Sequence, residues 1–338
     1  NSHLLSQTSL KGKKVLLRLD LDVPLKDGVV VDDRRLKLAL HSLKKCLSEA
    51  SQTLIIGHLG RPAGEDASLS LKPAINTLKS MIDRDIPLIP SLDGLGQWGT
   101  DTPLAALENL RFWEGEDQND PNFARSLADK FDIYVFDAFA ASHRPSASGI
   151  GVPALLPSLI GFQFEAELAA LSPIIHNPKR PITLILGGSK PDKVQNVDKL
   201  LTHVDNLLLG GSIVASAPDL PRLVKAQLTD DGMDITPASV DIFRSYINSS
   251  STLIWNGPVG KYEDNFHATA TYNLAQVIAT ANAYKVAGGG DTEAVISKLN
   301  LESKFNYIST GGGALLYYLA FHTLPSLDAI NSSPAISA

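Results

Sequence analysis

The sequence of 338 residues contains a single cysteine, Cys46, so no disulfide bond can form within the chain. A protein without disulfides suits a reducing compartment. No segment reaches the roughly 18 consecutive apolar residues that a membrane-spanning helix needs, and the first residues show no basic stretch followed by an apolar one. We therefore expect a cytoplasmic protein with no membrane partner.

The sequence also lacks an excess of positive charge. Its 30 Lys and Arg residues face 36 Asp and Glu residues, a net charge of -6. General nucleic-acid binding usually needs a strongly basic face, so we expect no nucleic-acid partner and local clusters for any anionic ligand. With 44% hydrophobic residues, a chain of this length can bury two cores, which favours two domains.

The familiar nucleotide motifs are absent too, because neither G-x-x-x-x-G-K-[ST] nor a G-x-G-x-x-G after a strand occurs. Two other glycine-rich runs are present, Gly288–Thr292 and Ser309–Gly313. Glycine lets backbone N–H groups approach phosphate oxygens, and a helix that begins there adds partial positive charge. These runs indicate a ligand with more than one phosphate.

Short apolar runs alternate with stretches of helical period, which predicts an α/β fold of parallel sheets covered by helices. The predicted strands are Lys14–Leu19, Thr53–Gly57, Ile133–Phe136, Ile182–Leu186, Asn206–Gly210, Thr252–Trp255, Tyr284–Ala287 and Tyr307–Ser309. Loops that follow such strands are where open α/β sheets bind ligands. A domain boundary is expected around Gly149–Gly161, before a helical run over Phe164–Ile174 that either joins two lobes or is an ordinary surface helix.

Basic and acidic residues of the first half recur directly after the predicted strands. They are Asp20, Asp22, Arg35, His58, Arg61, Arg111, His143 and Arg144. Taken singly, the acidic residues are ordinary turn formers or helix caps and each Arg is an ordinary surface residue. Several guanidinium groups that converge would instead bind a small phosphorylated acid, because their planar forks pair with phosphate and carboxylate.

In the second half, Lys190 and Lys193 follow a strand and precede a helical pattern, a position suited to nucleotide phosphates. Asp291 follows a glycine triplet and is either a Mg²⁺ ligand or a simple helix N-cap.

Taken in order, these motifs resemble the phosphoglycerate kinase family along almost the whole chain. The matching segments are Val15–Asp20, His58–Pro62, Leu107–Phe112, Asp137–Phe139, His143–Arg144, Gly187–Lys190, Trp255–Pro258, Gly288–Thr292 and Ser309–Ala314. The resemblance implies two Rossmann-like lobes joined by a hinge helix, with the acid substrate on the first lobe and MgATP or MgADP on the second. It places the first lobe at residues 1–157, the connecting helix at 158–175, the nucleotide lobe at 176–312, and a tail at 313–338 that returns to the first lobe.

The resemblance further implies reversible phosphoryl transfer between 1,3-bisphosphoglycerate and MgADP, giving 3-phosphoglycerate and MgATP, in a monomer that closes about a hinge. The acid site by matching positions is Asp20, Asp22, Arg35, His58, Arg61, Arg111, His143 and Arg144. The nucleotide site is Gly188, Lys190, Lys193, Gly232, Asn256, Glu263, Gly289, Gly290, Asp291 and Thr292, with Asp291 on the metal. Arg35, Lys190 and the amides of Gly311 and Gly312 would stabilise the group in transfer.

Three of the features that depart from the family pattern favour a second hypothesis. Asp22 stands where the family has Asn, Lys190 and Lys193 are three residues apart instead of four, and several dozen residues are missing between Gly211 and Gly232. These departures leave a second hypothesis open, a catalytically weak or inactive relative that binds a ligand or a partner protein.

Overall fold

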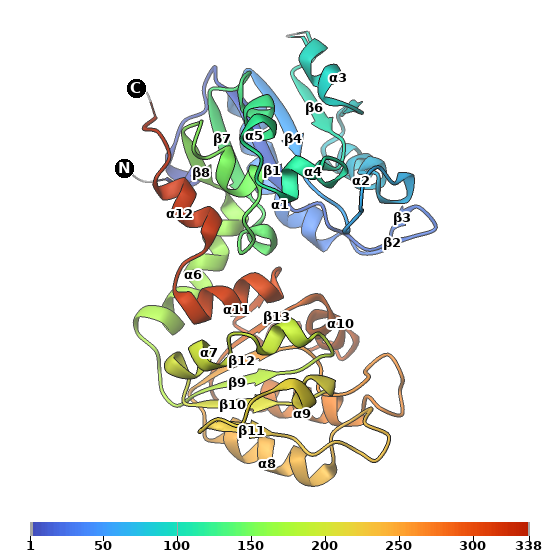
Figure 1. Cartoon of the computed structure of the whole chain (residues 1–338), viewed down its shortest axis with the longest axis vertical. Helices are drawn as coiled ribbons and strands as arrows, with labels where there is room; N and C mark the ends of the chain where they lie inside the picture. Colours follow the sequence, from blue (N-terminus) through green and yellow to red (C-terminus); the bar gives the residue numbers. More distant parts are fainter. Residues whose placement is uncertain (1–2, 100, 337–338) are drawn as a thin grey trace. The chain divides into compact units, whose positions relative to one another are not determined.

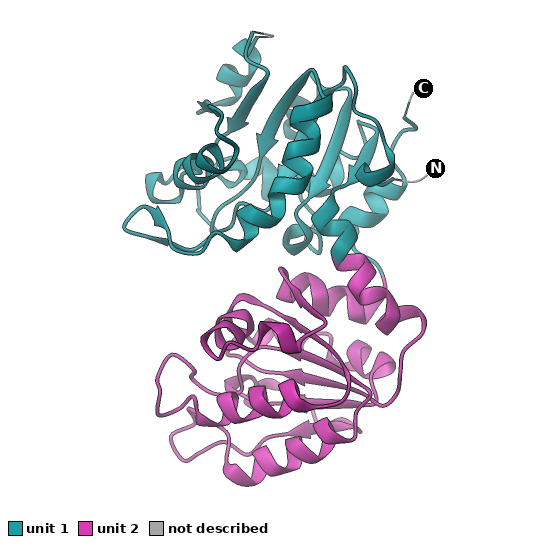
Figure 2. Cartoon of the chain, turned by 180° about the vertical axis from the view of Figure 1, so that it is seen from behind, with its two compact units in different colours: residues 1–166, 323–338 teal, residues 167–322 magenta. Residues whose placement is uncertain are grey.

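The computed structural model describes residues 3–99 and 101–336 and divides into two compact units, coloured separately in Figure 2. Unit 1 comprises Asn1–Ala166 and Thr323–Ala338, and unit 2 comprises Glu167–His322. Each unit is an α/β structure with a parallel sheet of its own (Figure 1).

The unit 1 sheet has six parallel strands in the order β5-β6-β4-β1-β7-β8. Their bounds are β1 Lys14–Leu19, β4 Gln52–Ile56, β5 Leu88–Ile89, β6 Leu104–Leu107, β7 Ile133–Asp137 and β8 Ser158–Ile160. A separate antiparallel hairpin is formed by β2 (Leu25–Lys26) and β3 (Val29–Val30). β1 lies in the middle of the sheet and pairs in parallel with β4 on one side and β7 on the other.

Helices cover this sheet on both faces. They are α1 Arg34–Glu49, α2 Lys72–Ile82, α3 Leu92–Gln97, α4 Glu114–Asp117, α5 Pro121–Ala128 and α12 Pro325–Asn331. On one face, Leu36 and Leu43 of α1 and Leu78 of α2 pack with Leu17 of β1. The apolar stripe of α1 therefore supplies much of the unit 1 core.

The unit 2 sheet also has six parallel strands, in the order β11-β10-β9-β12-β13-β14. Their bounds are β9 Ile182–Leu186, β10 Asn206–Leu209, β11 Leu223–Lys225, β12 Thr252–Asn256, β13 Tyr284–Gly288 and β14 Tyr307–Ser309. The chain runs outward from β9 to β11 and then returns to the other side of β9, so the strand order reverses between β9 and β12. Ligands of doubly wound sheets bind at such a switch point.

The helices of unit 2 are α7 Val197–His203, α8 Pro237–Asn248, α9 Thr269–Thr280, α10 Gly290–Lys298 and α11 Gly312–Phe321. Phe243 of α8 and Leu274 of α9 pack on Ile185 and Trp255 of the sheet. Helices α7 and α11 contact each other, and Figure 1 shows them on the opposite face from α8 and α9.

All the predicted strands are present within one or two residues of their predicted bounds. The helix expected over residues 158–175 is α6, Phe162–His176, and it begins later because Ser158–Ile160 form β8 beside β7. A π-helix, Ala147–Gly151, overlaps the start of the expected boundary segment Gly149–Gly161. No helix of the described residues is long and apolar enough to cross a membrane.

Candidate active site

The charged residues singled out in the first half meet at one edge of the unit 1 sheet. Parallel strands end at the same edge, so the loops after β1, β4, β6 and β7 come together there. We call the set made up of Arg35, His58, Arg61, Arg111, His143 and Arg144 the basic cluster.

Acidic residues of the loop after β1 hold parts of the basic cluster in place. Arg35, in the first turn of α1, pairs through Nη1 with Asp20 at 3.1 Å. Asp22 accepts a hydrogen bond from the Gly60 N–H at 2.9 Å, and its other oxygen lies 3.9 Å from Nε2 of His58. Asp22 therefore lies beside the basic cluster.

His58 is buried and neutral. Its Nδ1 lies 2.7 Å from Nη2 of Arg18, and since a guanidinium only donates, that nitrogen must be the acceptor. Burial lowers the pKa of His58 well below its ordinary value, and the charges of Arg18, Arg111, Arg35 and Arg144 lower it further. Because the charges of four arginines all lower the pKa of this one imidazole, these arginines lie around it.

His143 is neutral at physiological pH for similar reasons. Burial lowers its pKa to about 4, and Arg144, Arg61 and Arg111 contribute in the same direction. Arg144 lies beside it, with Nε 3.4 Å from the imidazole Nε2. The positive charge of the basic cluster near pH 7 is thus carried by arginine alone.

The loop after β4 is fixed by the loop after β6. Arg111 donates from Nη1 to the Gly60 carbonyl at 2.6 Å and lies 3.4 Å from Asp117 through Nε. Asn109 is fully buried and donates to the Leu59 carbonyl at 2.8 Å. Arg61 itself is exposed and stays available to a ligand.

In unit 2 a cavity of about 310 Å³ lies at the carboxyl edge of the sheet. We call it the unit 2 cavity. It is lined by Gly188, Ser189, Gly211, Ser212, Gly232, Met233, Pro258, Gly260, Lys261, Tyr262, Glu263 and Asp291. The loops after β9 and β12 both contribute, so the cavity lies at the switch point of the sheet.

Two glycines allow these loops to approach closely. Gly257 has φ +99°, and a Cβ there would overlap the Gly187 carbonyl and lie 2.7 Å from Nζ of Lys193. Gly211 has φ +74°, and its Cβ would lie 2.6 Å from the Gly188 carbonyl oxygen. Only glycine takes such a backbone conformation at no steric cost, so side chains at these positions would push the loops apart.

The two lysines of this loop differ in environment. Lys193 is half-buried in a 3₁₀ turn, Pro191–Val194, and donates to the Gly187 carbonyl at 2.8 Å. Burial lowers its pKa, while the nearby Asp291 acts in the opposite direction. Lys190 caps the same turn and is exposed. Neither lysine lines the unit 2 cavity.

The first glycine run forms the start of α10, which begins at Gly290 with Gly289 as its N-cap. Asp291 lies in the first turn, so the alternative that it is the N-cap does not hold. Its Oδ1 accepts a hydrogen bond from the Tyr262 hydroxyl at 3.1 Å, and burial together with Asp291 raises the pKa of Tyr262 to about 12. Asp291 thereby presents a carboxylate to the cavity.

The second glycine run forms the start of α11, at Gly312 with Gly311 as N-cap. Asn256 donates from Nδ2 to the Gly312 carbonyl at 2.9 Å. Thr292 is fully buried and accepts a hydrogen bond from the Gly257 N–H at 2.6 Å. These two predicted site residues thus hold the backbone of the loops, and neither lines the cavity.

Asp291 fits a magnesium ion that is carried mainly by phosphate. Mg²⁺ is commonly held by one or two carboxylates together with substrate phosphates and water. Within residues 3–99 and 101–336, no group of three or more His, Cys, Asp or Glu side chains could bind a metal ion. Two carboxylates, Asp291 and Glu263, line the cavity, and Asp291 together with nucleotide phosphates and water would suit a nucleotide-bound ion.

Of the predicted nucleotide residues, Gly188, Gly232, Glu263 and Asp291 line the unit 2 cavity. Those that do not are Lys190, Lys193, Asn256, Gly289, Gly290 and Thr292, and the predicted transfer residues Gly311 and Gly312 do not line it either. Sequence reasoning missed the cavity residues Ser189, Ser212, Met233, Lys261 and Tyr262, and it missed Arg18 beside His58. Lys261 and Tyr262 lie in the loop that follows β12, and this position after a strand could have indicated them from the sequence.

Fold and site together define an α/β protein of two parallel-sheet units, each with polar loops at the carboxyl edge of its sheet. The phosphoglycerate kinase family model matches residues 5–217 and 220–321. The chain therefore belongs to the phosphoglycerate kinase family, a family of kinases. The match is interrupted at residues 218–219, within the shortened segment that precedes β11.

Individual relatives agree over nearly the whole chain. It is 35% identical to the phosphoglycerate kinase of Rubrobacter xylanophilus over 94% of this chain and 95% of the relative. It is 33% identical to that of Dictyoglomus turgidum over 96% of each.

Solved structures show the same likeness. Phosphoglycerate kinase from Coxiella burnetii matches with TM-score 0.78 at 30% identity, covering 97% of this chain and 98% of that one. The enzyme from Pyrococcus horikoshii matches with TM-score 0.81 at 25% identity, with the same coverage.

Proposed function

We propose that this chain is an active phosphoglycerate kinase that transfers a phosphoryl group reversibly between 1,3-bisphosphoglycerate and MgADP, giving 3-phosphoglycerate and MgATP. The observation that carries the proposal is that each unit has polar loops at the carboxyl edge of its sheet, the basic cluster in unit 1 and the glycine loops around the unit 2 cavity in unit 2. A chain of this family with two such sites suits a reaction between two phosphorylated ligands. A cytoplasmic location and a monomeric state stay predictions.

The acid binds at the basic cluster in this proposal. Arg61, Arg111 and Arg144 would pair with its phosphate and carboxylate through their planar guanidinium groups. Because His58 and His143 are neutral, they would contribute hydrogen bonds and shape without adding charge. Arg35, oriented by Asp20, would reach the group in transfer.

The nucleotide binds at the unit 2 cavity. In the glycine loops after β9 and β13, backbone N–H groups would donate hydrogen bonds to its phosphates. Lys193 would lie beside these phosphates. Glu263 would bind the ribose, and Asp291 would hold the Mg²⁺ that the nucleotide carries. When bound, that ion supplies further neutralisation of phosphate charge.

The reaction needs no general base, since the attacking oxygen is an ionised carboxylate or phosphate. Catalysis would consist of positioning and charge neutralisation. Lys190, exposed at its turn, and the N–H groups at the start of α11 would stabilise the transferring group. Removing one such donor typically costs about 100-fold to 1000-fold in rate.

Titration calorimetry tests the two halves separately. We expect 3-phosphoglycerate and MgADP to bind with independent stoichiometries of one. Arg111→Ala should abolish acid binding and leave MgADP affinity unchanged, whereas Asp291→Ala should weaken MgADP alone. Failure of the wild-type chain to bind either ligand would contradict the proposal.

A further inference from the structure

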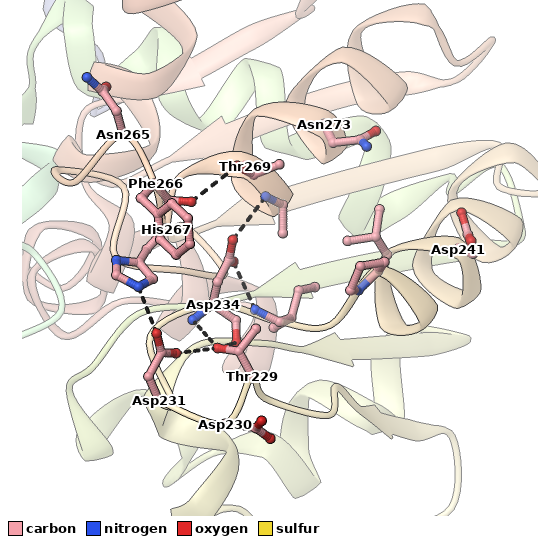
Figure 3. A pocket seen from close by; sticks show the side chains of 14 residues that line it. Thr229, Asp230, Asp231, Asp234, Asp241, Asn265, Phe266, His267, Thr269 and Asn273 are labelled. Atoms are coloured by element: carbon pink, nitrogen blue, oxygen red, sulfur yellow. Dashed lines mark hydrogen bonds and ion pairs between the residues drawn. The ribbon is translucent and has the colours of Figure 1, made fainter.

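His267 of unit 2 lies between two carboxylates, one of which is visible in Figure 3. Its Nε2 lies 2.8 Å from Oδ2 of Asp231, and its Nδ1 lies 2.7 Å from Oδ2 of Asp264. An ionised carboxylate only accepts hydrogen bonds, so both ring nitrogens must carry hydrogen. The geometry therefore describes an imidazolium, and we call this arrangement the His267 bridge.

Asp231 connects the His267 bridge to the backbone of the loop between β11 and α8. Its Oδ1 accepts from the Met233 N–H at 3.0 Å and from the Thr229 hydroxyl at 2.6 Å. The Met233 carbonyl accepts in turn from the Lys261 N–H at 2.8 Å. A continuous set of hydrogen bonds thus joins this loop to the loop between β12 and α9.

Both joined loops line the unit 2 cavity. The first contributes Gly232 and Met233, and the second contributes Lys261, Tyr262 and Glu263. Met233 is 41% exposed, so it offers apolar surface to a ligand. Its loop follows the shortened segment, and Asp234 of the same loop also accepts a hydrogen bond from the Ala270 N–H at 3.1 Å.

We propose that His267 is a positioning residue for nucleotide binding, which as a cation between Asp231 and Asp264 holds the Met233 loop against the Lys261 loop. The inference rests on the proposed binding of MgADP in the unit 2 cavity. Its consequence is that nucleotide affinity depends on a proton carried by a residue outside the cavity.

The charged groups that face His267 are Asp231, Asp264 and Asp234, and the charge of Lys261 acts on Asp264. The first two raise the pKa of His267 above its ordinary value. The pKa of Asp231 is lowered to about 2, first by the Thr229 hydroxyl and then by the Met233 N–H and His267. Both carboxylate oxygens of Asp234 accept hydrogen bonds from backbone N–H groups, those of Ile235 and Ala270.

The sign of the pH dependence follows from these shifts. A histidine whose folded pKa is raised contributes stability that is present below its unfolded pKa and lost as pH rises through the folded value. Asp231 and Asp264, whose pKa values are lowered, stay ionised down to acid pH. The His267 bridge is therefore charged below the ordinary pKa of histidine, and it loses its proton as pH rises through the raised pKa.

Calorimetric titration of MgADP at pH 7 and pH 9 tests the proposal. We expect wild-type affinity to fall about fivefold at pH 9 and His267→Gln to bind weakly at both values. His267→Arg keeps the cation, so it should bind tightly at both. Lys193 also has a lowered pKa. If the loss of MgADP affinity at pH 9 persisted in His267→Arg, it would be due to Lys193, and the inference would be overturned.

His176→Gln is the matched control, because His176 is an exposed histidine of the same unit that lines no part of the unit 2 cavity. It should behave as wild type, and acid affinity should be unchanged in all variants. If wild type binds MgADP and His267→Gln binds equally well, the inference fails and the proposed function stands. If wild type binds no MgADP at all, the proposed function fails and the inference with it.

Discussion

At the residue scale, Asp22 is the clearest departure from the family pattern. Its carboxylate accepts from the Gly60 N–H and lies 3.9 Å from Nε2 of His58. Its side chain is 40% exposed, so solvent screens its repulsion of an anionic substrate. The repulsion between Asp22 and the substrate is then about 1 kcal/mol, the value for two charges about 4 Å apart in water. A less exposed pair at that distance would repel by about 4 kcal/mol.

Asp22→Asn should therefore lower the KM for 3-phosphoglycerate about fivefold. Asparagine keeps the oxygen that accepts from Gly60 and removes the charge, so kcat and the KM for MgATP should change little. Steady-state kinetics with each substrate varied checks this result. Asp27→Asn, in the exposed hairpin turn, is the control, and an equal effect there would contradict the explanation.

Gly257→Ala tests the close approach of the unit 2 loops. A Cβ at φ +99° would overlap the Gly187 carbonyl, so we expect a loss of about 1 to 3 kcal/mol in the free energy of unfolding and about tenfold weaker MgADP binding. Urea unfolding and calorimetry measure the two effects. Gly96→Ala, with no atom within 4 Å of its Cβ, should leave both quantities unchanged. Unchanged MgADP binding in Gly257→Ala would contradict the close approach of the two loops.

At the element scale, the start of α6 is capped by a buried carboxyl group. Oδ1 of Asp137 accepts from the Phe164 N–H at 2.9 Å. Burial raises the pKa of Asp137 to about 6, partly offset by its hydrogen bonds. Between about pH 4 and 6 the folded state therefore holds a proton that the unfolded state has lost, and the free energy of unfolding falls as pH rises.

Asp137→Asn should remove this dependence, on the order of 3 kcal/mol between pH 4 and 7. The informative quantity is the difference between variant and wild type in urea unfolding at each pH, because His143 acts in the opposite direction. Its pKa of about 4 makes the fold less stable as pH falls below about 6.5. A difference that does not vary with pH would show that Asp137 is ionised throughout.

The longer strands could be predicted from sequence because each is a run of apolar residues that ends at a turn-forming residue. The strands missed are β2, β3, β5, β6, β8 and β11. They are two to four residues long, and such short runs carry no periodic signal. β8 was hidden for a further reason. Its residues follow Pro157 within a segment whose glycines and prolines indicated a boundary.

Of the site, sequence could predict the charged residues after strands, since topology brings those loops to one edge. It could not predict the His267 bridge, because Asp231 and His267 are 36 positions apart and meet only through the pairing of two loops. Nor could it distinguish cavity-lining residues from Thr292 and Asn256, which hold backbone groups. That distinction depends on side-chain direction.

At the scale of the whole molecule, the chain end belongs structurally to unit 1. The Ser326 N–H donates to the Ser142 carbonyl at 3.2 Å, and the Ser158 N–H donates to Ser333 Oγ at 3.1 Å. Leu324 and Ile330 are fully buried. Helix α12 thus completes the cover of β8.

Truncation after His322 should therefore destabilise unit 1. Burial of Leu324 and Ile330 contributes about 1.5 to 3 kcal/mol each, so a loss of about 3 to 6 kcal/mol in the free energy of unfolding is expected from urea titration. Truncation after Ser333 keeps α12 and its contacts and should cost much less. Equal losses in both truncations would contradict a structural role for α12.

The central claim is that both anion sites serve one phosphoryl transfer. A coupled assay of ATP formation from 1,3-bisphosphoglycerate and MgADP tests it most directly, with Arg35→Ala and Lys190→Ala as comparators. We predict turnover by the wild-type chain that falls at least about 100-fold in each variant. Wild-type turnover no greater than that of Arg35→Ala would contradict the claim.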